Sequence, residues 1–98
     1  MTPPVLEVAV DNLADAKAAV AAGAGRLELC DRLDLDGLSP SEDLVVEALK
    51  LGVPVFTMVR PHDNGFGYSA AELQAMSAEI RGFRKLGVHG LVFGALDG

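Results

Sequence analysis

AAGAGRLELC (residues 21–30) contains the junction that decides the fold, because a predicted helix ends and a predicted strand begins within it. Gly23 follows an Ala-rich segment and suits the left-handed conformation that ends helices. The short apolar run Leu27–Leu29 comes next. The same helix–Gly–strand order recurs in KLGVPVFTM (residues 50–58) and KLGVHGLVF (residues 85–93). Three copies of this junction predict repeating βα units.

The rest of the chain continues this alternation. Four apolar runs are predicted strands: Val5–Val10, Leu27–Leu29, Val55–Val59 and Leu91–Ala95. The three segments between them have the features of helices, and each opens with residues that cap helix N-termini. These residues are Asp11 with Asn12, Ser39 with Pro40 and Glu42, and Ser69 with Glu72. In the third helix, the helical spacing of the apolar residues predicts that Leu73 faces the sheet and Glu79 faces away from it.

These elements predict an α/β fold made of a parallel (βα)3β unit. Strands joined by helical crossovers run parallel, with right-handed connections. The order fits either a doubly wound sheet or half of a TIM (β/α)8 barrel, and the pattern alone does not choose between them. The polar residues of interest lie within strands or just after them, and function in TIM barrels clusters at the C-terminal ends of the strands. This placement favours the half-barrel.

Composition argues against several classes of function. The chain has 98 residues, half of them hydrophobic, and its net charge of −6 with scattered basic residues predicts no nucleic-acid-binding surface. No apolar stretch reaches the ~20 residues of a membrane-spanning helix, and the N-terminus does not resemble a signal peptide. The single cysteine, Cys30, forms no internal disulfide, which suits a reducing cytoplasm.

Four polar side chains are predicted to share one face of the sheet. Glu7 and Glu28 alternate with apolar residues, Cys30 has the same parity as Glu28, and Arg60 follows the third strand. A buried carboxylate needs a partner, and Arg60 is the predicted partner of Glu28 or Glu7. In a barrel interior the four would converge near the C-terminal mouth. They would either perform acid–base chemistry on a small anionic ligand held by Arg60, or form an ion pair that fixes strand register.

Cys30 is the predicted ligand if the chain binds a metal. There is no Cys-x-x-Cys and no His pair at ligand spacing, but Met58 and His62 are possible companions of Cys30 for a soft ion such as Cu(I). The alternative is that Cys30 is a small buried hydrophobe and Met58 belongs to the core. Tyr68, the only tyrosine, would hydrogen-bond a ligand or cover the start of the third helix. His89 precedes the last strand and is predicted to be structural.

Six strings together resemble the CutC copper-homeostasis family: LEVAVDN, AGAGRLELC, GLSPS, VFTMVRP, GFGYS and GLVFGALDG. They occur in the family's order and cover nearly the whole chain. The resemblance implies a cytoplasmic (β/α)8 barrel, usually longer than this chain, and a role in copper tolerance, without an assigned enzymatic reaction. Positions typical of the family are occupied by Glu7, Glu28, Cys30, Arg60, Pro61, Phe66, Tyr68, Ser69 and Gly94.

Three departures from the family pattern bear on this resemblance. Ala9 stands where the family often has a cysteine, so a copper site with thiols from the first two strands is not available. The loop that usually reads RPRGGDF is RPHDNGF here, which brings in His62 and Gly65. The residues that the family carries in its C-terminal half, including a His-Arg pair after the fourth strand, are not in this sequence.

We therefore expect residues 1–98 to form the N-terminal half of a CutC-like TIM barrel. The expected function is copper homeostasis in the cytoplasm, with any bound copper centred on Cys30. The alternatives are a TIM-barrel enzyme of unknown reaction that acts on a small anionic ligand, and an inactive truncated fragment. Half a barrel leaves sheet edges unpaired. We therefore expect the chain to be part of a longer protein or to form a homo-oligomer with a second copy.

Overall fold

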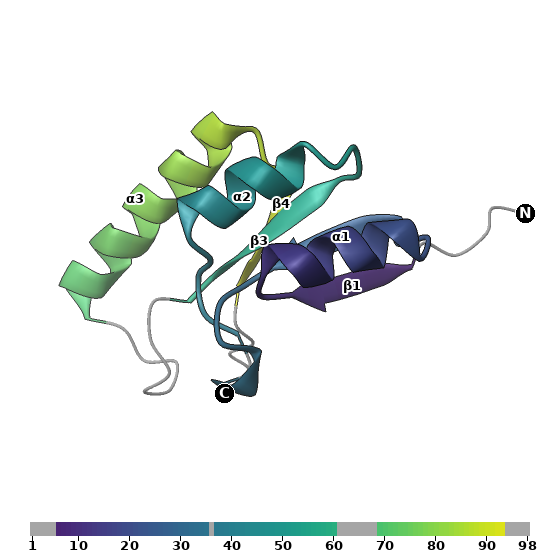
Figure 1. Ribbon diagram of the computed structural model, residues 1–98. Coiled ribbons are helices and arrows are strands. Elements are labelled where there is room, and N and C mark those ends of the chain that lie inside the picture. Colours follow the sequence, from purple (N-terminus) through teal and green to yellow (C-terminus); the bar gives the residue numbers. More distant parts are fainter. Residues whose placement is uncertain (1–5, 36, 61–68, 94–98) are drawn as a thin grey trace, which may run out of the picture.

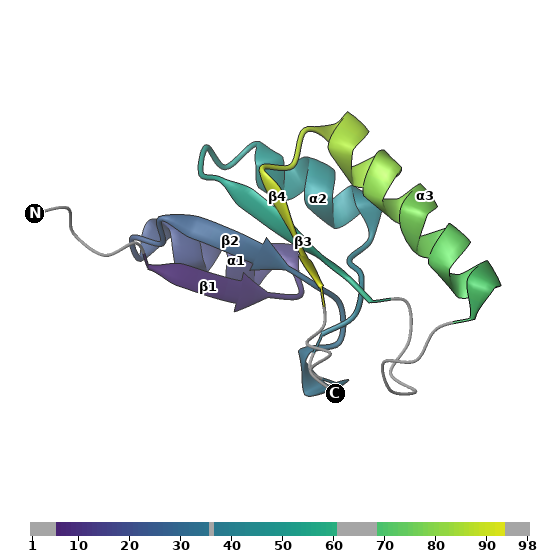
Figure 2. The same cartoon turned by 180° about the vertical axis from the view of Figure 1, so that it is seen from behind.

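The computed structural model describes residues 6–35, 37–60 and 69–93. In chain order the elements are β1 (Glu7–Val10), α1 (Leu13–Ala21), β2 (Arg26–Leu29), the short 3-10 helix η1 (Leu33–Leu35), α2 (Glu42–Leu49), β3 (Val55–Val59), α3 (Ala70–Leu86) and β4 (Gly90–Phe93). The four strands are parallel and lie side by side in the order β1-β2-β3-β4. All three α-helices cover one face of this sheet (Figures 1 and 2). The predicted α/β fold with a parallel (βα)3β sheet is confirmed.

The strand register sorts side chains onto two faces of the sheet. Leu27 lies beside Val8 of β1 and Val55 of β3, and these residues point toward the helices. Glu28, one residue later, lies beside Ala9 and Phe56 on the opposite face. We call this second face the open face, because no helix among the described residues covers it (Figure 2). By register it carries Glu7, Ala9, Arg26, Glu28, Phe56, Met58, Gly90 and Val92.

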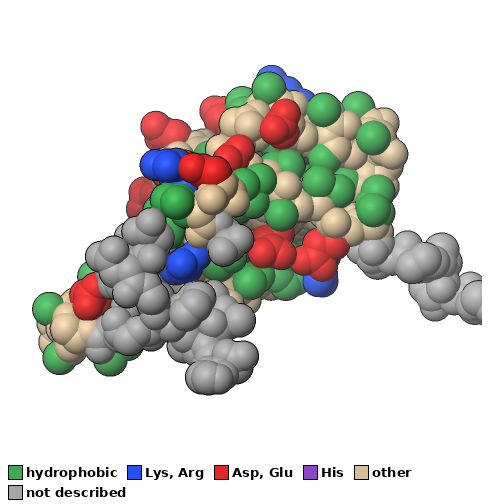
Figure 3. All heavy atoms as spheres, turned by 90° about the horizontal axis from the view of Figure 1, so that it is seen from below, with side chains coloured by type: hydrophobic (Ala, Val, Ile, Leu, Met, Phe, Trp, Pro, Cys, Tyr) green, Lys and Arg blue, Asp and Glu red, His purple; other side chains and the backbone are tan. Residues whose placement is uncertain are grey.

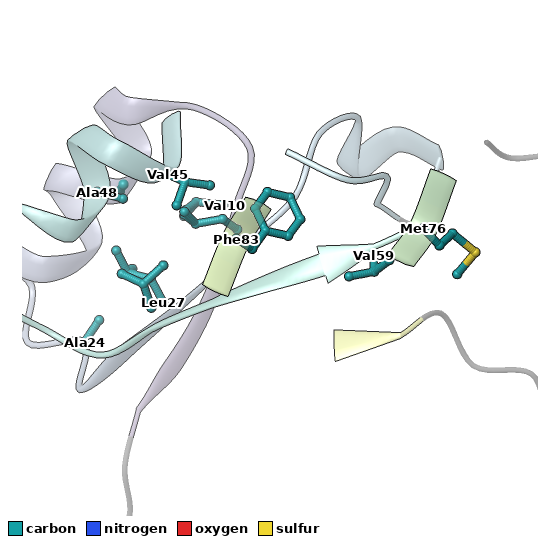
Figure 4. Close-up of a cluster of buried hydrophobic side chains, with 11 residues drawn as sticks. Val10, Ala24, Leu27, Val45, Ala48, Val59, Met76 and Phe83 are labelled. Atoms are coloured by element: carbon teal, nitrogen blue, oxygen red, sulfur yellow. The ribbon is translucent and has the colours of Figure 1, made fainter. Parts of the chain in front are cut away.

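The hydrophobic core lies between the sheet and the helices (Figure 4). Its strand residues include Leu27, Leu29 and Val55, all fully buried. Its helix residues are Ala16 of α1, Val45 and Ala48 of α2, and Met76 and Phe83 of α3. Burying one such aliphatic or aromatic side chain contributes roughly 1.5–3 kcal/mol. The apolar parity of the strands therefore determines which face the helices cover.

The predicted helix boundaries are confirmed at most ends. The Asn12 side chain accepts a hydrogen bond from the backbone N–H of Asp15, and α3 begins with the predicted capping box of Ser69 and Glu72. Gly87, the C-cap of α3, has a φ of 95°, and the glycines that follow α1 and α2 have positive φ as well. Only glycine adopts this conformation without strain, so the recurring glycines end the helices as expected.

The predicted start of α2 is wrong. Its N-cap is Ser41, whose Oγ accepts the backbone N–H of Leu44 at 3.2 Å, and not Ser39. The hydroxyl of Ser39 instead accepts the N–H of Arg60 at 2.8 Å and donates to Glu79 at 3.0 Å. These bonds join residues far apart in the sequence, and local capping rules do not anticipate them.

Two residues of α3 also differ from the helical-spacing prediction. Leu73 was expected to pack on the sheet and is 51% exposed. Glu79 was expected to face away, but it reaches Ser39 and is only partly exposed. α3 therefore turns a polar position toward the connection that follows β2. No helix among the described ranges has both the length and the apolar character to cross a membrane.

Candidate functional site

The open face carries a charged cluster at the start of β1 and β2. Arg26 Nη2 lies 2.6 Å from Glu7 Oε2, and Arg26 Nε lies 3.1 Å from the same oxygen. The two residues are direct neighbours in the β1–β2 register. Arg26 also stacks on Phe56, with the guanidinium carbon 4.4 Å from the ring centroid. Acidic and basic side chains lie together among apolar ones in the view from below (Figure 3).

Phe56 is held in place from both sides. A Cβ atom added at Gly90 of β4 would lie 2.6 Å from Cδ2 of the Phe56 ring, closer than two carbon atoms tolerate. The ring therefore occupies the space that glycine leaves on β4, while Arg26 of β2 lies over it. Gly90 is needed here for the close approach of the ring, and the ring in turn supports the guanidinium of Arg26.

The two carboxylates of the cluster are electrostatically distinct. Hydrogen bonding to Arg26 lowers the pKa of Glu7 below its ordinary value. Burial raises the pKa of Glu28, and its hydrogen bond with Glu7 and the negative charge of Glu7 raise it further. Glu28 therefore holds its proton more tightly than Glu7, whose ionised form is favoured by the guanidinium beside it.

Arg60 does not belong to this cluster, and its predicted pairing with Glu28 or Glu7 is wrong, since no ion pair joins it to either carboxylate within the described residues. Glu7 is paired with Arg26, as described above, and Arg60 Nη1 donates to the carbonyl oxygens of Leu35 at 2.8 Å and Gly37 at 3.1 Å. Arg60 is only 6% exposed. Arg26 is in register with Glu7, whereas Arg60 follows the far end of β3.

Arg26 is the functional-site residue that the sequence reasoning missed. A signal for it was present, because Arg26 and Glu28 alternate with Leu27 in the same strand and so share a face. The predicted convergence of four side chains is therefore corrected. Glu7 and Glu28 lie with Arg26, while Cys30 and Arg60 lie where β2 and β3 lead into their following loops.

Cys30 and Met58 form a second group at the C-terminal side of the sheet, which we call the sulfur pair. Both approach Gly37, at which an added Cβ would lie 3.2 Å from Met58 Cε and 3.5 Å from Cys30 Sγ. Cys30 is 1% exposed and Met58 8% exposed. The Cys30 thiol lies 3.6 Å from the carbonyl oxygen of Val10, and this contact is a weak hydrogen bond. A thiol and a thioether thus lie under one glycine.

The environment of Cys30 disfavours its thiolate. Burial raises the pKa of the thiol to about 11, and the negative charges of Asp11, Glu28 and Asp31 act in the same direction. Within the described ranges, no three His, Cys, Asp or Glu side chains lie close enough together to hold a metal ion. His62 and Tyr68, the other predicted ligand-binding residues, lie outside the described residues.

His89 has the structural role that was expected. The ring Nδ1 of His89 accepts a hydrogen bond from the backbone N–H of Val55 at 3.1 Å. The backbone N–H of His89 donates to the carbonyl oxygen of Val55 at 2.8 Å. The side chain thus joins the entry of β4 to the start of β3, at the N-terminal end of the sheet.

A pocket of about 360 Å³ opens at the N-termini of α1 and α2. It is lined by Asp11, Asn12, Leu13, Cys30, Asp31, Ser41, Asp43, Leu44 and Glu47. Two of its acidic residues, Asp11 and Asp31, contribute to the raised pKa of Cys30. The charged cluster on the open face does not contribute to this pocket.

We expect Glu28→Gln to stabilise the protein at neutral pH. The folded-state pKa of Glu28 is raised above the ordinary value near 4.5. Its protonated form therefore contributes its full stability below pH 4.5, and this contribution is lost as the pH rises through the folded-state pKa. Gln keeps the neutral form at every pH. The variant should therefore match the parent near pH 4 and exceed it at pH 7 by less than about 1 kcal/mol, because solvent screens this partly exposed group.

Urea unfolding of both proteins at the two pH values measures this difference. Glu47→Gln is the matched control for removal of one carboxylate, because Glu47 lies on α2, away from the charged cluster, and its ion pair with Lys50 is exposed to solvent. A Glu28→Gln variant that is less stable than the parent at pH 7, or whose effect is the same at both pH values, would contradict the raised pKa.

The fold and the two residue groups together define a class of protein. The chain is a parallel α/β protein whose (βα)3β sheet corresponds to about half of a TIM-barrel-like structure. It superposes with a TM-score of 0.83 and 33% identity on a solved structure described as a candidate copper homeostasis protein CutC from Streptococcus agalactiae. The match covers 95% of this chain and 47% of that one.

The family is shown by the sequence comparisons. The CutC family model matches residues 4–98, and the chain therefore belongs to the CutC family. A CutC family protein from Caulobacter vibrioides is 43% identical to this chain over 91 residues. One from Xanthomonas axonopodis pv. citri is 44% identical to it over 93 residues. The chain spans 37% and 39% of the length of these two relatives.

Proposed function

We propose that this chain serves copper homeostasis by binding Cu(I) at the sulfur pair, with Cys30 as the principal ligand and Met58 as its companion. The name of the solved relative supports the process, and one observation carries the site: both sulfur side chains approach the same Gly37. Thiol and thioether sulfur are the ligands that soft Cu(I) prefers. The reduced thiol that this role requires is consistent with a cytoplasmic protein.

The local chemistry predicts modest affinity. Cu(I) binding to Cys30 releases its proton, and burial and the acidic neighbours hold that proton tightly. Ala9, where the family often has a cysteine, lies beside Glu28 on the open face and supplies no second thiol. Binding should therefore depend on Cys30 and strengthen as pH rises.

The test is a competition titration with a chromophoric Cu(I) chelator under reducing, oxygen-free conditions. Cys30→Ser should weaken binding by about tenfold or more, because the only thiolate is lost. Met58→Leu should weaken it less. Met76→Leu is the matched control, because Met76 is also buried but lies in α3 against the core. Equal binding by the parent and Cys30→Ser would remove Cys30 as the ligand and refute the proposed site.

The geometry gives less support to an enzyme that acts on a small anion. In that hypothesis Arg60 would hold the ligand beside Glu7 and Glu28. Arg60 instead donates to backbone carbonyl oxygens and is buried, and Arg26, the guanidinium beside the carboxylates, is already paired with Glu7. Copper homeostasis therefore remains the proposed function.

A further inference from the structure

The sulfur pair is covered by the connection between β2 and α2. Directly after Cys30 this connection turns back on itself, since Asp31 and Leu38 exchange backbone hydrogen bonds of 2.8 and 2.6 Å. The carbonyl oxygen of Arg32 accepts a hydrogen bond from the backbone N–H of Gly37 at 3.1 Å, which tightens the turn. Gly37 has a φ of 92° and lies directly against Cys30 and Met58.

Arg60 fastens this covering backbone to the end of β3. Its guanidinium donates to the carbonyl oxygens of Leu35 and Gly37, and Gly37 lies against the sulfur pair. Hydrogen bonds from a charged donor are stronger than neutral ones, and here they are formed in a buried setting. Arg60 thus spans from the strand that carries Met58 to the backbone that covers Cys30.

Ser39 and Glu79 fix the position of Arg60. Ser39 exchanges two hydrogen bonds with the Arg60 backbone, donating its N–H to the Arg60 carbonyl at 2.9 Å and accepting the Arg60 N–H on Oγ at 2.8 Å. The Ser39 hydroxyl donates in turn to Glu79 of α3 at 3.0 Å. A continuous set of hydrogen bonds therefore connects α3, the end of β3 and the cover over the sulfur pair.

We propose that Arg60 is a positioning residue that controls access to Cys30, and that Ser39 and Glu79 support it. Cys30 also lines the pocket at the N-termini of α1 and α2. In this mechanism the main route to the sulfur pair opens when the Arg60 hydrogen bonds to Leu35 and Gly37 break and the backbone at Gly37 lifts. The rate at which Cys30 reacts then reports this local opening rather than global unfolding. The proposal deepens the proposed copper function, but its test uses no copper.

The experiment measures the rate at which a maleimide alkylates Cys30 in the folded protein at a fixed pH. Cys30 is the only cysteine of the sequence, so the labelling rate reports a single site. Arg60→Gln should raise the rate by about tenfold or more, since one charged hydrogen bond shifts an opening equilibrium by about a decade. Arg60→Lys, which keeps a charged donor, should raise it less. Arg81→Gln, on the exposed side of α3, should leave it unchanged.

Urea unfolding of each variant separates local opening from loss of the fold. If Arg60→Gln does not fold, Ser39→Ala tests the same cover, because it removes the hydroxyl that accepts the Arg60 N–H and leaves the guanidinium in place. It should raise the labelling rate by several-fold while the folded fraction stays near that of the parent. Folded Arg60→Gln or Ser39→Ala protein that labels at the parent rate would overturn the proposal and indicate entry through the pocket between α1 and α2.

The outcomes of the copper and labelling experiments are independent. If Arg60→Gln speeds labelling and the parent binds no Cu(I), the control of access stands and the proposed function fails. If the parent binds Cu(I) through Cys30 and labelling is insensitive to Arg60, the function stands and the control of access fails.

Discussion

Leu27→Ala is expected to lower the free energy of unfolding by ~2–5 kcal/mol, because a fully buried leucine would be replaced by a cavity and lost contacts. Leu27 is 0% exposed and lies in a central strand, beside Val8 and Val55 and beneath the helices (Figure 4). Native domains are stable by only about 5–15 kcal/mol. In a chain of this size the substitution therefore removes a large share of the total, and could leave the protein unfolded at 37 °C.

Urea denaturation followed by circular dichroism measures this loss. Leu73→Ala is the matched control, because it deletes the same atoms from a side chain that is 51% exposed. It should change the free energy of unfolding by less than about 1 kcal/mol. Similar losses for the two variants would mean that the helix-covered face of the sheet is not the main source of stability.

The isolated chain is expected to self-associate through its sheet edges and open face. β1 and β4 form the edges of the described sheet, and each has a neighbour on one side only. The apolar residues Leu6 and Phe93, next to or within these edge strands, are each 53% exposed. Unpaired strand backbone beside exposed apolar side chains favours pairing with another chain. A second copy is the partner that is always present in a purified sample.

Sedimentation velocity over a wide range of protein concentration tests this expectation. The sedimentation coefficient should rise with concentration, and Val92→Lys should weaken self-association by about tenfold or more, because it places a charge on the open face of the β4 edge. Ala78→Lys adds the same charge on the exposed side of α3 and should have little effect. A monomer at all concentrations that unfolds cooperatively would show that the edges need no partner.

The sequence predicted the repeating part of the structure correctly, because that part depends on short-range rules. Glycines after helices, capping residues before them and short apolar runs are each read within a few residues of the chain. The alternation in RLELC also placed Leu27 and Glu28 on opposite faces, and the register confirms this. Parity is a local property of an extended strand, so it survives whatever the neighbouring strands do.

The partners of the polar side chains were not predicted, because they depend on how separate segments meet. Parity allowed either Arg26 or Arg60 to pair with Glu7, and the β1–β2 register selected Arg26. The capping signal at Ser39 was locally sound, but the hydroxyl is bound by Arg60 and Glu79 instead. Local sequence rules do not specify which residues come into contact when the residues lie this far apart in the sequence.

By itself, then, the sequence determined the parallel βα order, the face of the sheet that meets the helices, and the presence of a single thiol at the end of β2. Only the tertiary structure decided that this thiol lies with Met58 under Gly37, and that Arg60 holds the covering backbone in place. The physical reason is that the two kinds of property depend on interactions of different range. Backbone conformation and side-chain parity are set by neighbours along the chain, whereas burial, pKa and hydrogen-bond partners are set by whatever the folded chain brings within a few ångströms.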